Sequence, residues 1–231
     1  MVNPQQPRFL VFLTLLVHLL ISLMSFKSLA NEAALYDLAP QGSAFLRIID
    51  LRKNSPDSLL PKSASKITLN IKGKSLSAEA YCSASEFIYL PPGEYRKNIN
   101  GLLWRDSLEA GQAYSLVVDN HSARLLKDYR AEDSRRAVLA VYNFSNLSQL
   151  DLVTAKSARP VFSSIPQGES IARLINPLKI AFNLIDRTDP NGKNIAVIDG
   201  IIFQPAVLSS LFICEDKQGV FTRWADRVGG Q

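Results

Sequence analysis

Short runs in which apolar and polar residues alternate recur along this chain of 231 residues, with turn-forming residues between them. The clearest run spans residues 66–72, where Ile67, Leu69 and Ile71 alternate with polar residues. Because successive side chains of a strand point to opposite faces, this run predicts a strand with one face in a core and the other in water. Apolar positions at helical spacing are scarce, so the pattern predicts an all-β protein.

Turn chemistry separates several of the other runs. One run, at residues 87–90, ends at Pro91-Pro92-Gly93, and the next, at 95–99, ends at Asn100-Gly101 before residues 102–104. Proline fixes φ for a turn, and Asn-Gly tolerates the positive φ of a tight hairpin. A short helix is expected only at residues 147–155. The remaining strands are predicted at residues 44–50, 114–118, 123–127, 136–142, 179–185, 195–199, 206–213 and 220–224.

A charge run at residues 127–136 divides the chain into two halves that look alike. It places seven charged residues among ten, which is typical of a solvated connector. Each half opens with an apolar strand and closes with a strand pair across a polar turn. The spacing of the strands is typical of sandwiches. We therefore expect two tandem β-sandwich domains of immunoglobulin-like type, at residues 31–132 and 133–231.

The first 30 residues predict a signal peptide. They contain no acidic residue, Arg8 precedes an apolar stretch at residues 9–26, and Ser28-Leu29-Ala30 offers small residues to a signal peptidase. We expect cleavage after Ala30. The alternative is an uncleaved membrane anchor, because about 18 apolar residues lie at the lower limit for a membrane span.

Charge and histidine content exclude several functional classes. Without residues 1–30 the chain keeps 24 basic and 21 acidic residues, a net charge of +3, so nothing favours nucleic acid as a partner. His18 is removed with the signal peptide, which leaves His121 as the only histidine of the mature chain. Zinc and iron sites with several histidines are therefore excluded.

The two cysteines allow one internal disulfide. Cys82 and Cys214 lie 132 positions apart, in different predicted domains. We expect two buried reduced thiols, and a disulfide between the domains is the alternative.

Catalytic and metal-binding motifs are not recognisable. His121 lies in Asp119-Asn120-His121-Ser122, which predicts an exposed polar turn, and no Gly-x-Ser-x-Gly motif occurs. Asp189-Pro190-Asn191-Gly192 and the pair Glu215-Asp216 also predict turns, without the acid spacing of a calcium loop. Gly-rich phosphate loops and Cys-x-x-Cys are likewise missing from the sequence. We therefore expect no catalytic residue, metal or cofactor.

Four aromatic residues are candidates for binding a partner or a glycan, namely Tyr36, Tyr95, Trp104 and Trp224. Flat rings bury a large area at low entropic cost, which suits sugar stacking and protein interfaces. Packing in the core is the alternative for each of them. Tyr36 differs from the others because it precedes the first predicted strand.

Two segments carry a resemblance to a known family. Ala33-Ala34-Leu35-Tyr36, followed by residues 39–47, resembles the mature N-terminus of the alginate biosynthesis protein AlgF family. Ile175-Asn176-Pro177 resembles that family's Ile-Asn-Pro block in the second half of the chain. The order of signal peptide, first β unit, charged connector and second β unit, which opens near residues 141–145, also agrees. Cys82, Cys214 and a longer insertion at residues 52–65 depart from the pattern.

The resemblance implies a periplasmic accessory protein of exopolysaccharide O-acetylation, built from two β-sandwich domains and without a catalytic centre of its own. Its implied partners are a membrane acyltransferase and periplasmic O-acetyltransferases, which it would link as an adaptor, and the processed chain would not be an integral membrane protein. One alternative is a polysaccharide-binding module that uses the exposed aromatic residues. Another is an acetyl-ester hydrolase or transferase with a site around His121.

Overall fold

The computed structural model of the chain describes residues 39–53, 66–129, 133–189, 191–225 and 228–229. Every helix or strand element in these ranges is a β-strand, which confirms the all-β prediction. None of the described residues forms a helix long and apolar enough to span a membrane. The predicted signal peptide and Tyr36 lie outside the described residues. Residues 41–231 form one compact unit, to which the following description applies.

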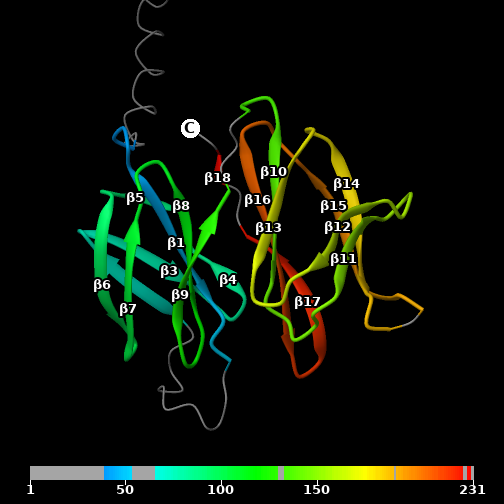
Figure 1. Ribbon diagram of the computed structural model, residues 1–231, viewed down its shortest axis with the longest axis horizontal. Helices are drawn as coiled ribbons and strands as arrows, with labels where there is room; N and C mark the ends of the chain where they lie inside the picture. Colours follow the sequence, from blue (N-terminus) through cyan, green and yellow to red (C-terminus); the bar gives the residue numbers. More distant parts are fainter. Residues whose placement is uncertain (1–38, 54–65, 130–132, 190, 226–227, 230–231) are drawn as a thin grey trace, which may run out of the picture. The chain divides into compact units, whose positions relative to one another are not determined.

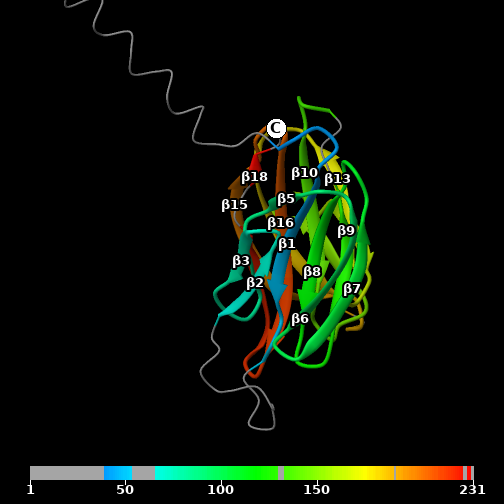
Figure 2. The ribbon, with the colours of Figure 1, turned by 90° about the vertical axis from the view of Figure 1, so that its left-hand side faces the viewer.

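The first half of this unit has a central sheet with two hairpins on its outer side (Figures 1 and 2). In the sheet, β1 (Ala44–Asp50) pairs with β4 (Ser83–Ala84), β5 (Ile88–Leu90) and β8 (Ala113–Val118), and β8 pairs with β9 (Ala123–Asp128). The hairpins are formed by β2 (Ile67–Ile71) with β3 (Lys74–Ala78), and by β6 (Gly93–Ile99) with β7 (Leu102–Leu108). We call this sheet the first central sheet.

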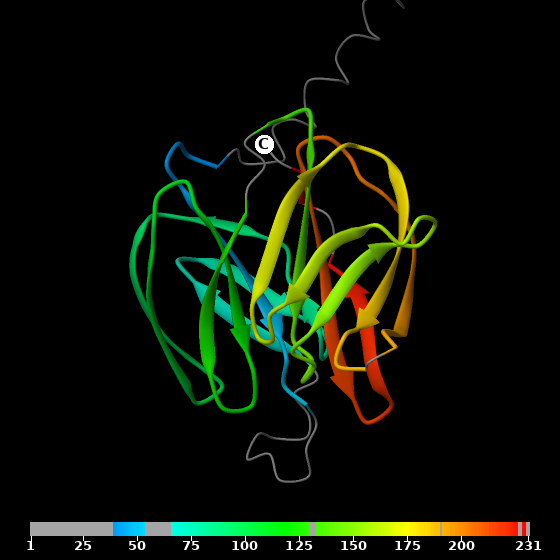
Figure 3. The ribbon, with the colours of Figure 1, turned by 45° about the vertical axis from the view of Figure 1, so that its right-hand side comes forward.

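The second half contains a second central sheet and an outer sheet, both visible in Figure 3. The second central sheet has the order β13 (Ser170–Ile175), β10 (Ala137–Asn143), β16 (Val207–Asp216) and β17 (Gly219–Trp224), with β18 (Val228–Gly229) also paired to β16. The outer sheet has the order β12 (Pro160–Ile165), β11 (Leu150–Thr154), β14 (Lys179–Asp186) and β15 (Lys193–Ile202).

The two halves repeat one strand arrangement. In each, the opening strand pairs in parallel with a later strand, β1 with β8 and β10 with β16. The later strand then forms an antiparallel hairpin with its successor, β8 with β9 and β16 with β17. These hairpins are the closing strand pairs that the sequence predicted. The immunoglobulin-like assignment and the boundary between residues 132 and 133 stay predictions.

Among the described residues, three hydrophobic clusters hold the unit together. The first core lies between the first central sheet and the hairpins, and the second core between the second central sheet and the outer sheet. A third cluster, which we call the middle core, joins the two central sheets through Ile49, Val117, Ala140, Tyr142 and Phe212, together with both cysteines. The central strands are therefore buried on both faces, which explains why their sequences are nearly continuous apolar runs.

Local predictions for the hairpins are confirmed. In β2, residues Ile67, Leu69 and Ile71 are buried while the two between them are exposed. Between β6 and β7, Asn100 and Gly101 both have positive φ, 50° and 90°, as a two-residue hairpin turn of right-handed strands requires.

Two local predictions are wrong. The helix expected at residues 147–155 is strand β11, because Leu150 and Leu152 enter the second core and the strand pairs with both β12 and β14. The charge run at residues 127–136 is not a solvated connector throughout. Its second residue, Asp128, ends β9 and is only 5% exposed. The Asp128 carboxylate is held inside because it accepts hydrogen bonds from the hydroxyls of Ser115 and Tyr142.

Candidate functional site

The seam between the two central sheets holds a group of buried polar contacts. Alternate residues of β1 and β8 face the first core or the seam, and alternate residues of β10 and β16 face the second core or the seam. Strand alternation therefore carries Arg47 and Ser115 into the seam from one side and Tyr142 from the other.

Four buried side chains form a closed hydrogen-bond network in the seam. Arg47 donates from Nε to Ser115 Oγ and from Nη2 to Tyr142 Oη, both at 2.7 Å. The Ser115 and Tyr142 hydroxyls each donate to a different carboxylate oxygen of Asp128. Arg47 and Asp128 also form an ion pair at 3.6 Å, and none of the four residues is more than 5% exposed. A buried ion pair is tolerated when its charged groups also make hydrogen bonds, and here each carboxylate oxygen of Asp128 accepts one.

Aromatic rings surround the guanidinium of this network. The Cζ atom of Arg47 lies 4.7 Å from the ring centre of Phe87, 5.3 Å from that of Tyr142 and 5.5 Å from that of Phe212. Such contacts stabilise a desolvated cation. Burial is the largest cause that raises the pKa of Tyr142, so its phenol keeps the proton that it donates to Asp128.

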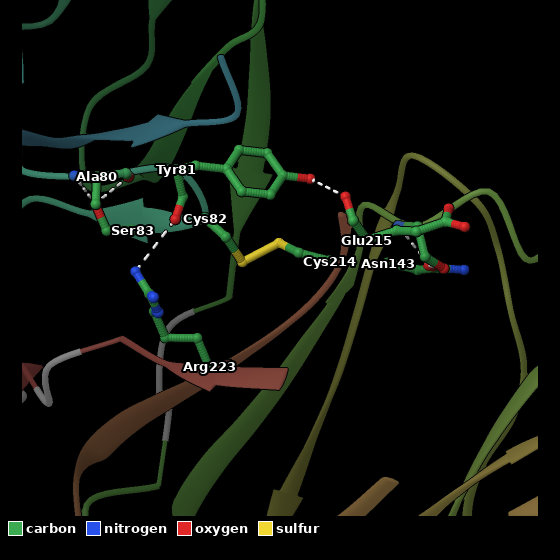
Figure 4. The surroundings of a disulfide bond; sticks show 9 residues. Ala80, Tyr81, Cys82, Ser83, Asn143, Cys214, Glu215 and Arg223 are labelled. Atoms are coloured by element: carbon green, nitrogen blue, oxygen red, sulfur yellow. Dashed lines mark hydrogen bonds between the residues drawn. A yellow bond between two sulfur atoms is a disulfide. The ribbon is translucent and has the colours of Figure 1, made fainter. Parts of the chain in front are cut away.

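A disulfide crosses the seam between Cys82 and Cys214, as Figure 4 shows. The prediction of two reduced thiols is therefore wrong. Separation along the sequence did not keep the residues apart, because the middle core brings the two Cα atoms to 6.3 Å. Both cysteines are fully buried, and Cys82 has a positive φ of 62°.

The neighbours of the cysteines add further contacts across the seam. The Tyr81 hydroxyl donates to the Glu215 carbonyl at 2.7 Å, and the Arg223 guanidinium donates to the Tyr81 carbonyl at 3.1 Å (Figure 4). The rings of Tyr81 and Phe221 meet edge to face at 6.1 Å. Burial is also the largest cause that raises the pKa of Tyr81. The two halves are thus fixed to each other by covalent, polar and aromatic contacts.

A groove of about 660 Å³ opens beside the disulfide, with walls from both halves. On the wall formed by the first half, Asp50 and Arg52 form a buried bidentate ion pair. The Nε–Oδ1 distance is 2.9 Å and the Nη2–Oδ2 distance is 2.7 Å. The opposite wall comes from the β16–β17 hairpin and includes Asp216 and Arg223. Charges of both signs therefore face this groove.

A second groove, of about 820 Å³, contains the candidate residue Trp224. It lies between β15 and β17, which are the outermost strands of their sheets. Trp224 is half-buried and meets the ring of Phe203 edge to face at 6.1 Å. The groove also contains Asp199, Thr222 and Val197, and the last of these is 69% exposed. This groove offers an aromatic ring together with polar groups that accept or donate hydrogen bonds.

Two of the other predicted aromatic residues, Tyr95 and Trp104, do not reach a surface site. Tyr95 and Trp104 are 6% and 1% exposed and stack on each other in the first core at 6.3 Å. Their rings fill the space between the hairpins and the first central sheet, and we do not retain them as glycan-binding residues. Tyr36 lies outside the described residues.

Two of the predicted turns contain hydrogen bonds of their own, whereas the turn predicted at Glu215-Asp216 is wrong because both residues pair with β17 at the end of strand β16. Asp119 Oδ1 accepts from the backbone amides of His121 and Ser122, which makes this segment an exposed Asx-type turn. Asp189 accepts from the Gly192 amide through its carbonyl, as in a β-turn. Within the described residues, no group of three or more His, Cys, Asp or Glu residues is arranged to hold a metal ion.

Sequence reasoning missed the seam residues. Arg47 was the sequence signal for these contacts, because it is a charged residue in the middle of strand β1, whose other residues before the final Asp50 are apolar. A charge in a strand buried on both faces requires a buried partner. Neither the identity of that partner nor the role of Tyr142 is encoded locally, since the residues are 95 positions apart.

Comparison with known sequences points to one family. The family model described as "Alginate O-acetyl transferase AlgF" matches residues 18–198. The alginate biosynthesis protein AlgF of Pseudomonas fluorescens is 24% identical over 209 residues, covering 89% of this chain and 88% of the relative. That of Azotobacter vinelandii is 32% identical over 160 residues, 68% of each chain. A solved structure of the C-terminal domain of AlgF from P. aeruginosa aligns with 22% identity and a TM-score of 0.34, covering 39% of this chain and 96% of that domain.

Proposed function

The chain belongs to the AlgF family of alginate O-acetylation, and from this premise we propose that it is a non-catalytic periplasmic adaptor required for O-acetylation of alginate or a similar exopolysaccharide. In this proposal it links a membrane acyltransferase to periplasmic O-acetyltransferases. Residues 31–132 and 133–231 are its two β-sandwich domains. The name of the family model includes a transferase activity, whereas the proposed role is positional.

The observation that carries the proposal is the middle core. An adaptor that acts by position needs a fixed distance between the surfaces that contact its partners. Here the two central sheets share one buried layer, and the Arg47–Tyr142 hydrogen bond and the disulfide both cross it. Holding two enzymes on one rigid body raises their effective concentration toward each other without any chemistry by the adaptor.

The state of the nucleophilic residues supports a non-catalytic role. Cys82 and Cys214 are joined to each other, so neither thiol is free to attack an acetyl ester. His121 lies in a turn in which its backbone amide, rather than its ring, makes the hydrogen bond to Asp119. A transferase of the serine type needs a base that is oriented by a third group.

A periplasmic location is supported by two features. The predicted signal peptide directs the chain out of the cytoplasm. A buried disulfide persists in an oxidising compartment such as the periplasm.

The non-catalytic part of the proposal is tested with His121→Ala in a strain that lacks the natural chain. We expect this variant to restore the O-acetyl content of the polymer as fully as the wild type, with Asn120→Ala as a matched control in the same turn. Loss of acetylation by His121→Ala alone, with normal abundance and unfolding midpoint, would contradict the proposal.

The partner-linking part is tested by crosslinking in cells. We expect the tagged wild-type chain to crosslink to both an O-acetyltransferase and the membrane acyltransferase. A tagged chain that restores acetylation but crosslinks to neither enzyme would exclude the adaptor role.

One observation favours a second function, the binding of polysaccharide through Trp224. Its ring lies in the groove between β15 and β17 beside Asp199 and Thr222, a combination suited to stacking on a sugar and hydrogen bonding to its hydroxyls. Trp224→Ala should then abolish retention on immobilised polymer, while Leu103→Ala, a change at an exposed apolar residue of β7, leaves it intact. Unchanged retention of a folded Trp224→Ala variant would exclude this function.

A further inference from the structure

The Cys82–Cys214 disulfide lies in a part of the seam that is closed from several directions. Both cysteines are fully buried in the middle core. Tyr81, next to Cys82, contacts the ring of Phe221, and Phe221 lies opposite Cys214 in the β16–β17 ladder. The hydrogen bond from Tyr81 to Glu215 crosses the seam beside the sulfurs (Figure 4). All of these contacts require the two halves to be docked.

Forming this bond requires access to the sulfurs. One cysteine thiolate attacks a disulfide of the oxidant and forms a mixed disulfide, and the second thiolate then displaces the oxidant. The two protein thiols lose two electrons and two protons in total, and the oxidant's disulfide takes them up to become a dithiol. An enzyme that performs this exchange must touch the sulfur atom, which a fully buried cysteine does not permit.

The rest of the seam does not depend on the disulfide. The network of Arg47, Ser115, Asp128 and Tyr142 joins the halves through side chains that no redox change alters. Each half also has a separate hydrophobic core, so each has the means to fold before docking. The reduced halves can therefore dock before the disulfide forms, so the order of docking and oxidation depends on their relative rates.

We propose that the cysteine pair is a maturation site for a protein dithiol oxidase, which acts on an open form of the chain before the two halves dock. Docking of the reduced chain closes the seam over both thiols and produces a kinetically trapped reduced form. The oxidase is thus a transient partner that recognises the undocked chain. This inference goes beyond the adaptor role and does not depend on it.

The test measures oxidation before and after docking. The mature full chain, residues 31–231, is reduced in urea and diluted without oxygen, and the oxidised form of a Cys-x-x-Cys protein dithiol oxidase is added either at once or after refolding. Gel shift with a maleimide polymer gives the fraction of free thiol. We expect delayed addition to slow oxidation at least about 100-fold, since reaction then requires opening of the seam, and urea to restore the fast rate.

A variant tests whether the contacts of the seam limit access to the thiols. Tyr142→Phe weakens the seam without altering the cysteines, and we expect it to speed oxidation after delayed addition about tenfold or more. Tyr129→Phe, a change at an exposed tyrosine, should behave as the wild type. Equal oxidation rates with immediate and delayed addition in the wild-type chain would overturn the proposal. So would a Tyr142→Phe rate identical to that of the wild type.

Discussion

Tyr142→Phe removes a single hydroxyl from the seam, and its cost follows from the contacts of that hydroxyl. The phenol accepts a hydrogen bond from Arg47 at 2.7 Å and donates one to Asp128. Both partners carry charge and are at least 95% buried, so water does not replace the lost bonds. Hydrogen bonds to charged groups contribute about 1.5–3 kcal/mol each, and we expect the loss of two of them to lower the free energy of unfolding by roughly 3–6 kcal/mol.

Equilibrium unfolding in urea measures this loss. With an m-value of about 2 kcal/mol per molar urea, the unfolding midpoint should fall by roughly 2 M. Tyr129→Phe is the matched control, because that tyrosine is 51% exposed, and its effect should stay within about 0.5 kcal/mol. A loss below about 1 kcal/mol for Tyr142→Phe at an unchanged m-value would refute the conclusion that this network holds the seam.

Three further outcomes follow from the same structure. Burial raises the pKa of Tyr142 above its ordinary value of 10.0. The neutral phenol therefore contributes its full stabilisation below pH 10, and this stabilisation is lost as the pH rises above that value. Between pH 10 and 11, the free energy of unfolding of the wild type in urea should fall by about 1 kcal/mol more than that of Tyr142→Phe. Replacing Cys82 and Cys214 together by Ala should lower the free energy of unfolding by up to about 5 kcal/mol, because the bond closes a loop of 132 positions in the unfolded chain; an unchanged midpoint would contradict this. Gly101→Ala should cost about 1 kcal/mol through its φ of 90° alone, since no atom outside its chain neighbours lies within 4 Å of an added Cβ, and a stabilised variant in thermal unfolding would contradict it.

Strands with one solvent-exposed face were predictable because the alternation of apolar and polar residues is a local sequence pattern. Strand β2 shows this most clearly, since each apolar residue of its alternating run is buried and each polar residue is exposed. Asn100-Gly101 likewise specified its hairpin turn through backbone conformation alone. A helix was wrongly predicted at residues 147–155 because Leu147, Leu150 and Val153 are spaced three apart, as on one face of a helix. Pairing with β12 and β14 overrode that spacing.

The seam was not predictable from the same signals. Continuous apolar runs such as β8 were recognised as strands, but an apolar run does not say which second sheet covers it. The disulfide depended on that missing sheet, because only the middle core brings Cys82 and Cys214 together. Tyr95 and Trp104 were candidates for a surface because the sequence does not show that the hairpins fold over them.

The adaptor role is tested most directly by the O-acetyl content of the secreted polysaccharide from a strain that lacks this chain, with polymer yield measured on the same cultures. We predict that acetyl ester disappears while yield stays near that of the parent strain, and that the wild-type chain restores the ester. A collapse of yield, or full acetylation in the absence of the chain, would contradict the role in O-acetylation.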